Sequence, residues 1–382
     1  MRAGLYRLVG RLVGRLPGRL PGLLPAGLPG WLMAGLALAG LAGPLGTLAA
    51  QRPAAGQKND QVTANLTGPL KWTVTGPMVS AMPDAKHAVI SVKDPTVVRW
   101  RGKWLVYATT ADRRGAWNME FLTFKNWRQA GTAKPYFMDA TPGFAGYHCA
   151  PELFYFRPQK KWYLIYQSGP PTYSTADDPS KPESWTKPQP LFASRPATVS
   201  AWLDFWVICD RAKCYLFFSG DNGNFYRSET WIGDFPKGWS TPRIAMHAGK
   251  AGDLYEASNT YRLKGRGEYL TLIEAMGGKT GKRYFRAFVA SRLDGAWKPL
   301  AQASTWDEPF LGEKNVSFAP GVAAWTSNLS HGEMIRAGFD EKLEIDPKHL
   351  EFVFQGVSAA DAAKAANYSQ IPWQLGIARQ QM

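Results

Sequence analysis

Residues 94–107 predict a β-hairpin, and their sequence is Asp-Pro-Thr-Val-Val-Arg-Trp-Arg-Gly-Lys-Trp-Leu-Val-Tyr. It contains an aromatic and β-branched strand, a tight polar turn and a second aromatic strand. Similar phrases begin at Ala150, Asp204 and Glu256, so the four starts are 56, 54 and 52 residues apart. Strand hairpins that recur at this spacing predict a β-propeller. The 313 residues from Leu70 to the C-terminus leave about 63 for each of five blades. We therefore expect an all-β chain folded as a five-bladed β-propeller.

The fifth repeat is the least regular. We expect its inner strand within residues 315–338, supplied by Ser-His-Gly-Glu-Met-Ile-Arg at 330–336. The tail, residues 371–379, is expected to close the ring against the first blade. Little helix is expected beyond residues 359–366.

The first fifty residues differ from the rest of the chain. They contain five arginines, no lysine and no acidic residue, and an apolar stretch from Trp31 ends in small residues. This pattern predicts a secretory signal peptide over 1–50, followed by a polar linker over 51–68 and the catalytic domain over 69–382. A retained membrane anchor and a misplaced start codon ahead of a shorter signal are the alternatives. We expect a secreted, extracellular monomer with no membrane attachment after cleavage.

The net charge is strongly positive. It is +15 for the whole chain and falls to +10 when the five arginines of the first fifty residues are removed. No dense run of Lys and Arg accompanies a known binding motif, so we expect no nucleic-acid partner. A scattered basic surface suits anionic cell-wall polymers instead.

Three cysteines are present. Cys209 and Cys214 lie on the two arms of one predicted hairpin, within reach of a disulfide in an exported protein. Cys149 is left over, and no histidine or other base stands beside it in the sequence. We expect Cys149 to be a small buried residue and not a nucleophile.

Three of the four repeats open with a carboxylate: Asp94, Asp204 and Glu256. The first strand of every propeller blade lines the central axis, so we expect these side chains to face one another across a pocket. An Asp at a strand start often only caps a turn, but three acids in equivalent repeats favour a site. Hydrolysis of a glycosidic bond needs two carboxyl groups, so the sequence predicts glycosidase chemistry.

Longer stretches resemble the α-L-arabinofuranosidases of glycoside hydrolase family 62, in order and over essentially residues 69–382. They include Lys93-Asp-Pro-Thr-Val-Val, Asp204-Phe-Trp-Val-Ile-Cys-Asp, Glu256-Ala-Ser-Asn, Arg283-Tyr-Phe-Arg286, Ser330-His-Gly-Glu-Met-Ile-Arg, and Tyr368 with Pro372-Trp. The resemblance implies a five-bladed propeller and an inverting, single-displacement reaction. It makes Asp94 the general base, Glu256 the general acid, and Asp204 the carboxylate that orients the sugar and raises the pKa of the acid.

Other matching positions imply further roles. By resemblance, Lys93, Arg286 and Tyr368 lie around the arabinose and the chain that carries it. The alternatives are a solvated strand end, a structural ion pair and simple packing, respectively. His331 matches a histidine that borders a calcium ion held mostly by waters, although imidazole is an unusual calcium ligand. The chemistry itself requires no cofactor.

The resemblance implies removal of single α-1,2- or α-1,3-linked L-arabinofuranosyl side groups from arabinoxylan, and the expected polysaccharide partner is arabinoxylan or arabinan. A related propeller glycosidase, such as an endo-arabinanase or a β-xylosidase, is one alternative. A non-catalytic carbohydrate-binding propeller is another. The chain has His148, Cys149 and Ser369 where the family commonly has Arg, Ala and Asn, and these differences bear on substrate preference.

Overall fold

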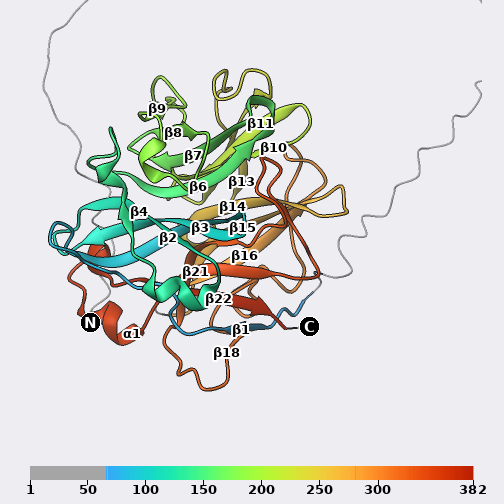
Figure 1. The fold of residues 1–382 in the computed structure, drawn as a ribbon. Coiled ribbons are helices and arrows are strands. Elements are labelled where there is room, and N and C mark those ends of the chain that lie inside the picture. Colours follow the sequence, from blue (N-terminus) through green and yellow to red (C-terminus); the bar gives the residue numbers. More distant parts are fainter. Residues whose placement is uncertain (1–65, 67, 280, 382) are drawn as a thin grey trace, which may run out of the picture. The chain divides into compact units, whose positions relative to one another are not determined.

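Regular structure in the computed structural model, which describes residues 66, 68–279 and 281–381, is almost entirely β-strand (Figure 1). The strands form five sheets of four or five strands each, and these are the five blades of a β-propeller. The predicted fold is confirmed. The one α-helix, α1 (Ala359–Lys364), lies within the predicted helical segment.

The first blade consists of β2 (Val89–Trp100), β3 (Lys103–Asp112), β4 (Trp117–Phe124) and β5 (Tyr136–Phe137), and the second of β6 (Cys149–Phe156), β7 (Lys161–Gln167), β8 (Pro171–Ala176) and β9 (Gln189–Pro190). The third consists of β10 (Leu203–Cys209), β11 (Lys213–Ser219), β12 (Asn224–Trp231) and β13 (Arg243–His247). The fourth consists of β14 (Glu256–Leu263), β15 (Tyr269–Gly277), β16 (Lys282–Ala290), β17 (Lys298–Pro299) and β20 (Glu344–Ile345). The fifth consists of β19 (Asn328–Met334), β21 (Glu351–Val357), β22 (Gln374–Gln380), β1 (Trp72–Val74) and β18 (Val316–Phe318).

The innermost strands β2, β6, β10, β14 and β19 contact one another in turn, and β19 returns to β2. β19 spans most of the segment expected to be the fifth inner strand. The tail belongs to the fifth blade and meets the first blade there, since the Val92 N–H of β2 donates to the Trp373 carbonyl at 3.0 Å. β22 pairs with β21 and with the N-terminal strand β1, so the fifth blade joins both ends of the described chain (Figure 1). Sequence patterns miss this closure because β1 has only three residues.

The turn between the first two strands of the first blade is a two-residue hairpin loop. Trp100 pairs with Lys103, and the intervening Arg101 and Gly102 have φ of 46° and 77°. A loop with positive φ at both positions matches the twist of the flanking strands, and Gly102 adopts that conformation without a Cβ clash.

The disulfide predicted in the third blade is present. Cys209 and Cys214 pair directly across β10 and β11, and their sulfurs are bonded. We expect the Cys209→Ser/Cys214→Ser variant to fold, with a loss of at most about 2 kcal/mol, because the closed loop is short. Chemical denaturation of both proteins measures this difference. Addition of a reductant should lower the stability of the native protein to that of the variant and leave the variant unchanged.

A buried polar cluster joins the inner strands about midway along their length, beneath the predicted carboxylates. Arg336 donates hydrogen bonds to the carbonyls of Val97 and Leu153, at 3.2 and 2.7 Å, and its guanidinium lies 2.6 Å from the Glu333 carboxylate. Glu152 accepts a hydrogen bond from the backbone N–H of Val207 at 2.7 Å. This Arg336 cluster therefore connects four of the five inner strands without exposure to solvent.

The predicted signal peptide and nearly all of the predicted linker lie outside the described residues. Within residues 66, 68–279 and 281–381, the structure contains no helix that is both long and apolar enough to cross a lipid bilayer.

Candidate active site

Each inner strand contains a β-bulge at the same height. The ladder between the first and second strands of each blade is interrupted just after Lys93, Cys149, Leu203, Glu256 and Ser330. In four blades the next residue has a left-handed φ: 47° at Asp94, 50° at Ala150, 55° at Asp204 and 53° at Ala257. Non-glycine residues adopt this conformation at a cost of about 1–3 kcal/mol each, and such strain is concentrated at functional sites. Bulges also re-aim side chains.

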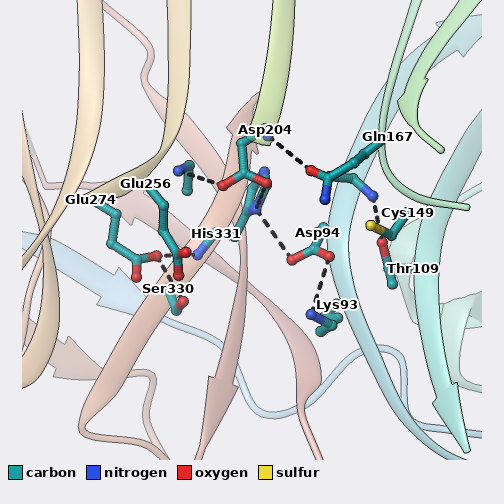
Figure 2. A network of polar contacts seen from close by, with 12 residues as sticks. Lys93, Asp94, Thr109, Cys149, Gln167, Asp204, Glu256, Glu274, Ser330 and His331 are labelled. Carbon is teal, nitrogen blue, oxygen red and sulfur yellow. Dashed lines mark hydrogen bonds and ion pairs between the residues drawn. The ribbon is translucent and has the colours of Figure 1, made fainter. Parts of the chain in front are cut away.

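This register corrects one sequence-based expectation. Asp94 and Asp204 occupy equivalent bulge positions, and His331 is the fifth member of the set. Glu256 is not equivalent to them: it pairs with Glu274 just as Lys93 pairs with Thr109, so it precedes the bulge by one residue. The three acids nevertheless project toward one another, with His331 between them (Figure 2).

Every bulge N–H receives a side-chain acceptor from the preceding blade. The five pairs are Ala150 with Thr109 at 2.7 Å, Asp204 with Gln167 at 3.3 Å, Ala257 with Asp204 at 2.8 Å, His331 with Glu274 at 2.8 Å, and Asp94 with Gln355 at 2.8 Å. In four pairs the acceptor belongs to the second strand of the preceding blade, and in the fifth it is the carboxylate of Asp204 itself. We call this set the inter-blade ring. It fixes the backbone beneath the acids.

Asp94 is buried between two cationic groups. Lys93 Nζ lies 3.5 Å from one carboxylate oxygen and His331 Nδ1 lies 3.2 Å from the other. Burial alone would raise the pKa of Asp94, but the charges of Lys93 and His331 outweigh it and hold the pKa well below its usual range. Asp94 is therefore ionised at any working pH, as a general base must be.

Asp204 has the opposite electrostatics. Burial raises the pKa of Asp204 to about 7, with His331 opposing and the negative charges of Glu256 and Asp94 adding to the rise. Burial would lower the pKa of His331, but Asp204 and Asp94 raise it to about 9. Near neutral pH the site therefore combines an ionised Asp94, a protonated His331 and an Asp204 close to its titration point.

These shifts predict a pH-dependent stability for Asp204→Asn. The pKa of Asp204 is higher in the folded chain than in the unfolded chain, so its contribution becomes less favourable as pH rises from about 4 to about 7. Asparagine preserves the acceptor for Ala257 and removes this loss. We expect the variant to gain more stability over wild type at pH 8 than at pH 5, by on the order of 2 kcal/mol. Denaturation at the two pH values measures it, and an equal difference at both would contradict the raised pKa.

Glu256 is held by an arginine that the sequence analysis did not select. The guanidinium of Arg283 contacts the carboxylates of both Glu256 and Glu274. Glu274 is fully buried and also accepts a hydrogen bond from the Ser330 hydroxyl at 2.7 Å. Arg283 thus couples Glu256 to the fifth blade, since Ser330 begins its bulge.

Arg286 is held by backbone carbonyls and not by the three acids. Its guanidinium donates to the carbonyls of Ser304 and Asp253, at 2.7 and 2.8 Å. Arg283 and Arg286 are three residues apart on β16, so their side chains point to opposite faces of the strand. Because side chains alternate between the two faces of a strand, only one of these two arginines can face the three acids. This alternation is the sequence signal that could have identified Arg283.

Lys93 and Tyr368 lie together beside Asp94. Lys93 is buried, and its Nζ lies 3.4 Å from the centre of the Trp117 ring and 4.9 Å from that of Tyr368. Arg283 also lies over Tyr368, with its guanidinium 5.8 Å from the ring centre. Lys93 is therefore not a solvated strand end, and the Tyr368 ring is contacted by two cations.

The expected calcium ion has no ready set of direct protein ligands. No group of three or more His, Cys, Asp or Glu side chains suited to a metal ion occurs in the described part of the chain. His331 points Nδ1 at Asp94 and Asp204, at 3.2 and 3.8 Å, and a protonated imidazole cannot ligate through that nitrogen. A calcium ion held mainly through waters stays a prediction.

Cys149 is buried, as predicted, and its thiol lies 3.2 Å from the Tyr147 hydroxyl. Burial raises the pKa of the thiol, which keeps it protonated and unreactive. His148, the neighbouring departure from the family pattern, is also buried, and burial lowers its pKa.

Comparison with known proteins agrees with this geometry. Residues 71–379 match the profile of Glycosyl hydrolase family 62. The chain is 40% identical over 320 residues to alpha-L-arabinofuranosidase C of Cellvibrio japonicus (strain Ueda107), covering 83% of this chain and 48% of that protein. The chain thus spans about half the length of this curated relative.

Two solved structures are similar over nearly their whole length. The catalytic domain of a family 62 α-L-arabinofuranosidase of Coprinopsis cinerea is 40% identical, with a TM-score of 0.77, and covers 82% of this chain and 97% of its own. An α-L-arabinofuranosidase of Podospora anserina, solved with cellotriose, is 39% identical, with a TM-score of 0.78, and covers 84% and 99%. With its profile match, its propeller and its converging acids, the chain belongs to glycoside hydrolase family 62.

Proposed function

We propose that this protein is an inverting α-L-arabinofuranosidase that releases single α-1,2- or α-1,3-linked L-arabinofuranosyl groups from arabinoxylan. The observation that carries the proposal is the convergence of Asp94, Asp204 and Glu256 on one end of the propeller axis, in three different electrostatic settings (Figure 2). Family membership and the arabinofuranosidase activity of the similar proteins support it.

In the proposed reaction, Asp94 accepts a proton from water as the water attacks the anomeric carbon. Lys93 and His331 keep Asp94 ionised before the attack, so its carboxylate is ready to act as base. Glu256 donates its proton to the departing glycosidic oxygen. The bond between that oxygen and the anomeric carbon breaks on the face opposite the attacking water. One displacement therefore inverts the anomeric configuration.

Asp204 is proposed to orient the arabinose and to favour the protonated form of Glu256 by its negative charge. Arg283 contacts the carboxylates of both Glu256 and the buried Glu274, and so holds Glu256 in place beside the other two acids.

Proton NMR of purified protein acting on arabinoxylan tests the reaction directly. We expect β-L-arabinofuranose as the first product, in contrast to the α-configuration of the substrate. Release of xylose or oligosaccharides would favour the related propeller glycosidases. Retained polysaccharide binding without any product would favour a binding propeller.

The role of Glu256 is tested by its dependence on the leaving group. We expect Glu256→Gln to reduce arabinoxylan hydrolysis by about 10³-fold but to spare much more of the rate on 4-nitrophenyl α-L-arabinofuranoside, because nitrophenolate leaves without a proton. Asp204→Asn is the matched comparison. If the leaving-group dependence appears in that variant instead, Asp204 is the proton donor.

The proposal extends to how the protein works in its surroundings. We propose export through the N-terminal signal, action as an extracellular monomer, and a polysaccharide partner that is arabinoxylan or arabinan. The similar Podospora anserina enzyme was solved with cellotriose and another family 62 hydrolase with xylotriose, which supports a β-linked glycan partner.

A further inference from the structure

An open cavity with charged residues in its lining lies at the opposite end of the propeller from the three acids. Its volume is about 330 Å³, and it is lined by Cys209, Asp210, Arg211, Ala212, Arg262, Tyr269 and Lys342. Asp204 lies near the start of β10 and Cys209 at its end, so the two sites are about 17 Å apart along this strand. One substrate group cannot occupy both.

The cavity is electropositive. Arg211 comes from the turn between β10 and β11, Arg262 from the end of β14, and Lys342 from the connection after β19. Among the described residues, Arg211 and Lys342 have no ion-pair partner, and Arg262 lies 3.4 Å from Glu344. The nearby Asp210 is occupied by its own turn: it accepts hydrogen bonds from two backbone N–H groups and from the Tyr215 hydroxyl.

The most exposed large apolar side chain in the described chain lies beside this cavity. Trp231 is 61% exposed, and the next residue, Ile232, donates a backbone hydrogen bond to the Ala212 carbonyl at 2.8 Å. Lys213 Nζ lies 4.9 Å from the centre of the Trp231 ring. A single exposed apolar side chain is common on a protein surface, but an indole next to a cavity with cationic side chains offers a flat face on which a sugar ring can stack.

We propose that Trp231, Arg211 and Lys342 form a remote binding site for a xylan chain that carries uronic acid side groups. A pyranose ring of the backbone stacks on the indole, and a uronate carboxylate is bound by the two unpaired cations. If Trp231 served only to pack the fold, its indole would be buried. If Arg211 and Lys342 served only for solubility, they would not need to line a cavity. The site uses none of the three acids, so it extends the proposed function and does not depend on it.

Affinity electrophoresis in gels that contain glucuronoxylan tests this site with the intact protein. We expect the Arg211→Ala/Trp231→Ala variant to bind glucuronoxylan about tenfold more weakly than wild type, a loss that one ring platform and one charge-assisted contact can supply. The matched control is Arg243→Ala/Ile244→Ala, which removes one arginine and one exposed apolar side chain from β13 of the same blade. The control should bind as wild type does.

The rate on 4-nitrophenyl α-L-arabinofuranoside separates this site from the active site. We expect that rate to be unchanged in both double variants. Weaker binding with an unchanged rate supports the proposal, and it would do so even if the wild type released no arabinose from any polymer. Equal binding by both double variants would overturn it. Equally strong, Trp231-independent retention by inorganic polyphosphate would also overturn it, because it would reveal simple ion exchange.

Discussion

Asp94→Asn should lower kcat by about 10³- to 10⁴-fold on both arabinoxylan and 4-nitrophenyl α-L-arabinofuranoside, with little change in KM. The asparagine keeps the shape of the side chain but removes the carboxylate that Lys93 and His331 hold in its ionised form. Attack by water is needed whatever group departs. The loss should therefore not depend on the leaving group, in contrast to that of Glu256→Gln. Initial rates on the two substrates give the comparison.

Two observations guard against a trivial loss of fold. Asp177→Asn removes an exposed carboxylate that pairs with Lys161 on the surface, and it should keep full activity. Asp94→Asn should lower the melting temperature at pH 7, because it leaves the buried Lys93 and His331 without the carboxylate between them, so its circular dichroism spectrum must match that of wild type at the assay temperature. If the variant retains activity within tenfold on both substrates, another group activates the water.

Arg336→Met should cause the largest loss of stability, about 3–5 kcal/mol, with no direct contact to the three acids. Arg336 is the cation between the buried Glu333 and Glu152, and it also bonds two inner-strand carbonyls. Methionine fills a similar volume but removes the buried cation from both carboxyl groups and the hydrogen-bond donor from both carbonyls. Urea denaturation measures the difference in unfolding free energy.

Arg379→Met is the control for Arg336→Met. Arg379 pairs with Glu351 at the surface and its side chain is 46% exposed. We expect this variant to lose less than about 1 kcal/mol. An equally small loss for Arg336→Met would show that the inner strands hold together without their buried cation.

The repeat in the sequence was sufficient to predict the blades, because hairpins of aromatic strands at regular spacing have few other solutions. It could not give the register of Glu256. A bulge adds one residue to a strand, and a one-residue shift leaves the hydrophobic pattern of the repeat almost unchanged. The phrase beginning at Glu256 therefore looked equivalent to the one beginning at Asp94, although Ala257 occupies that position.

The site was only partly predictable for a related reason. Asp94, Asp204, Glu256 and His331 begin or interrupt inner strands, where the repeat points to them. Arg283 and Glu274 come from outer strands of the fourth blade, whose inward face the sequence leaves undefined. Their roles emerge only when adjacent blades are placed side by side.

The inter-blade ring limits how this fold can exchange its parts. Each bulge that aims a side chain into the site is held by an acceptor from the blade before it, as Gln355 of the fifth blade holds Asp94 of the first. A blade is therefore the unit that repeats in the structure, but it is not a unit that can be exchanged on its own between related proteins. The smallest transferable piece runs from the second strand of one blade to the first strand of the next. Chimaeras cut within the loops between blades would separate every bulge from the acceptor that holds it. Cuts at the turn between the first two strands would keep four of the five pairs together and would separate only Asp204 from Ala257.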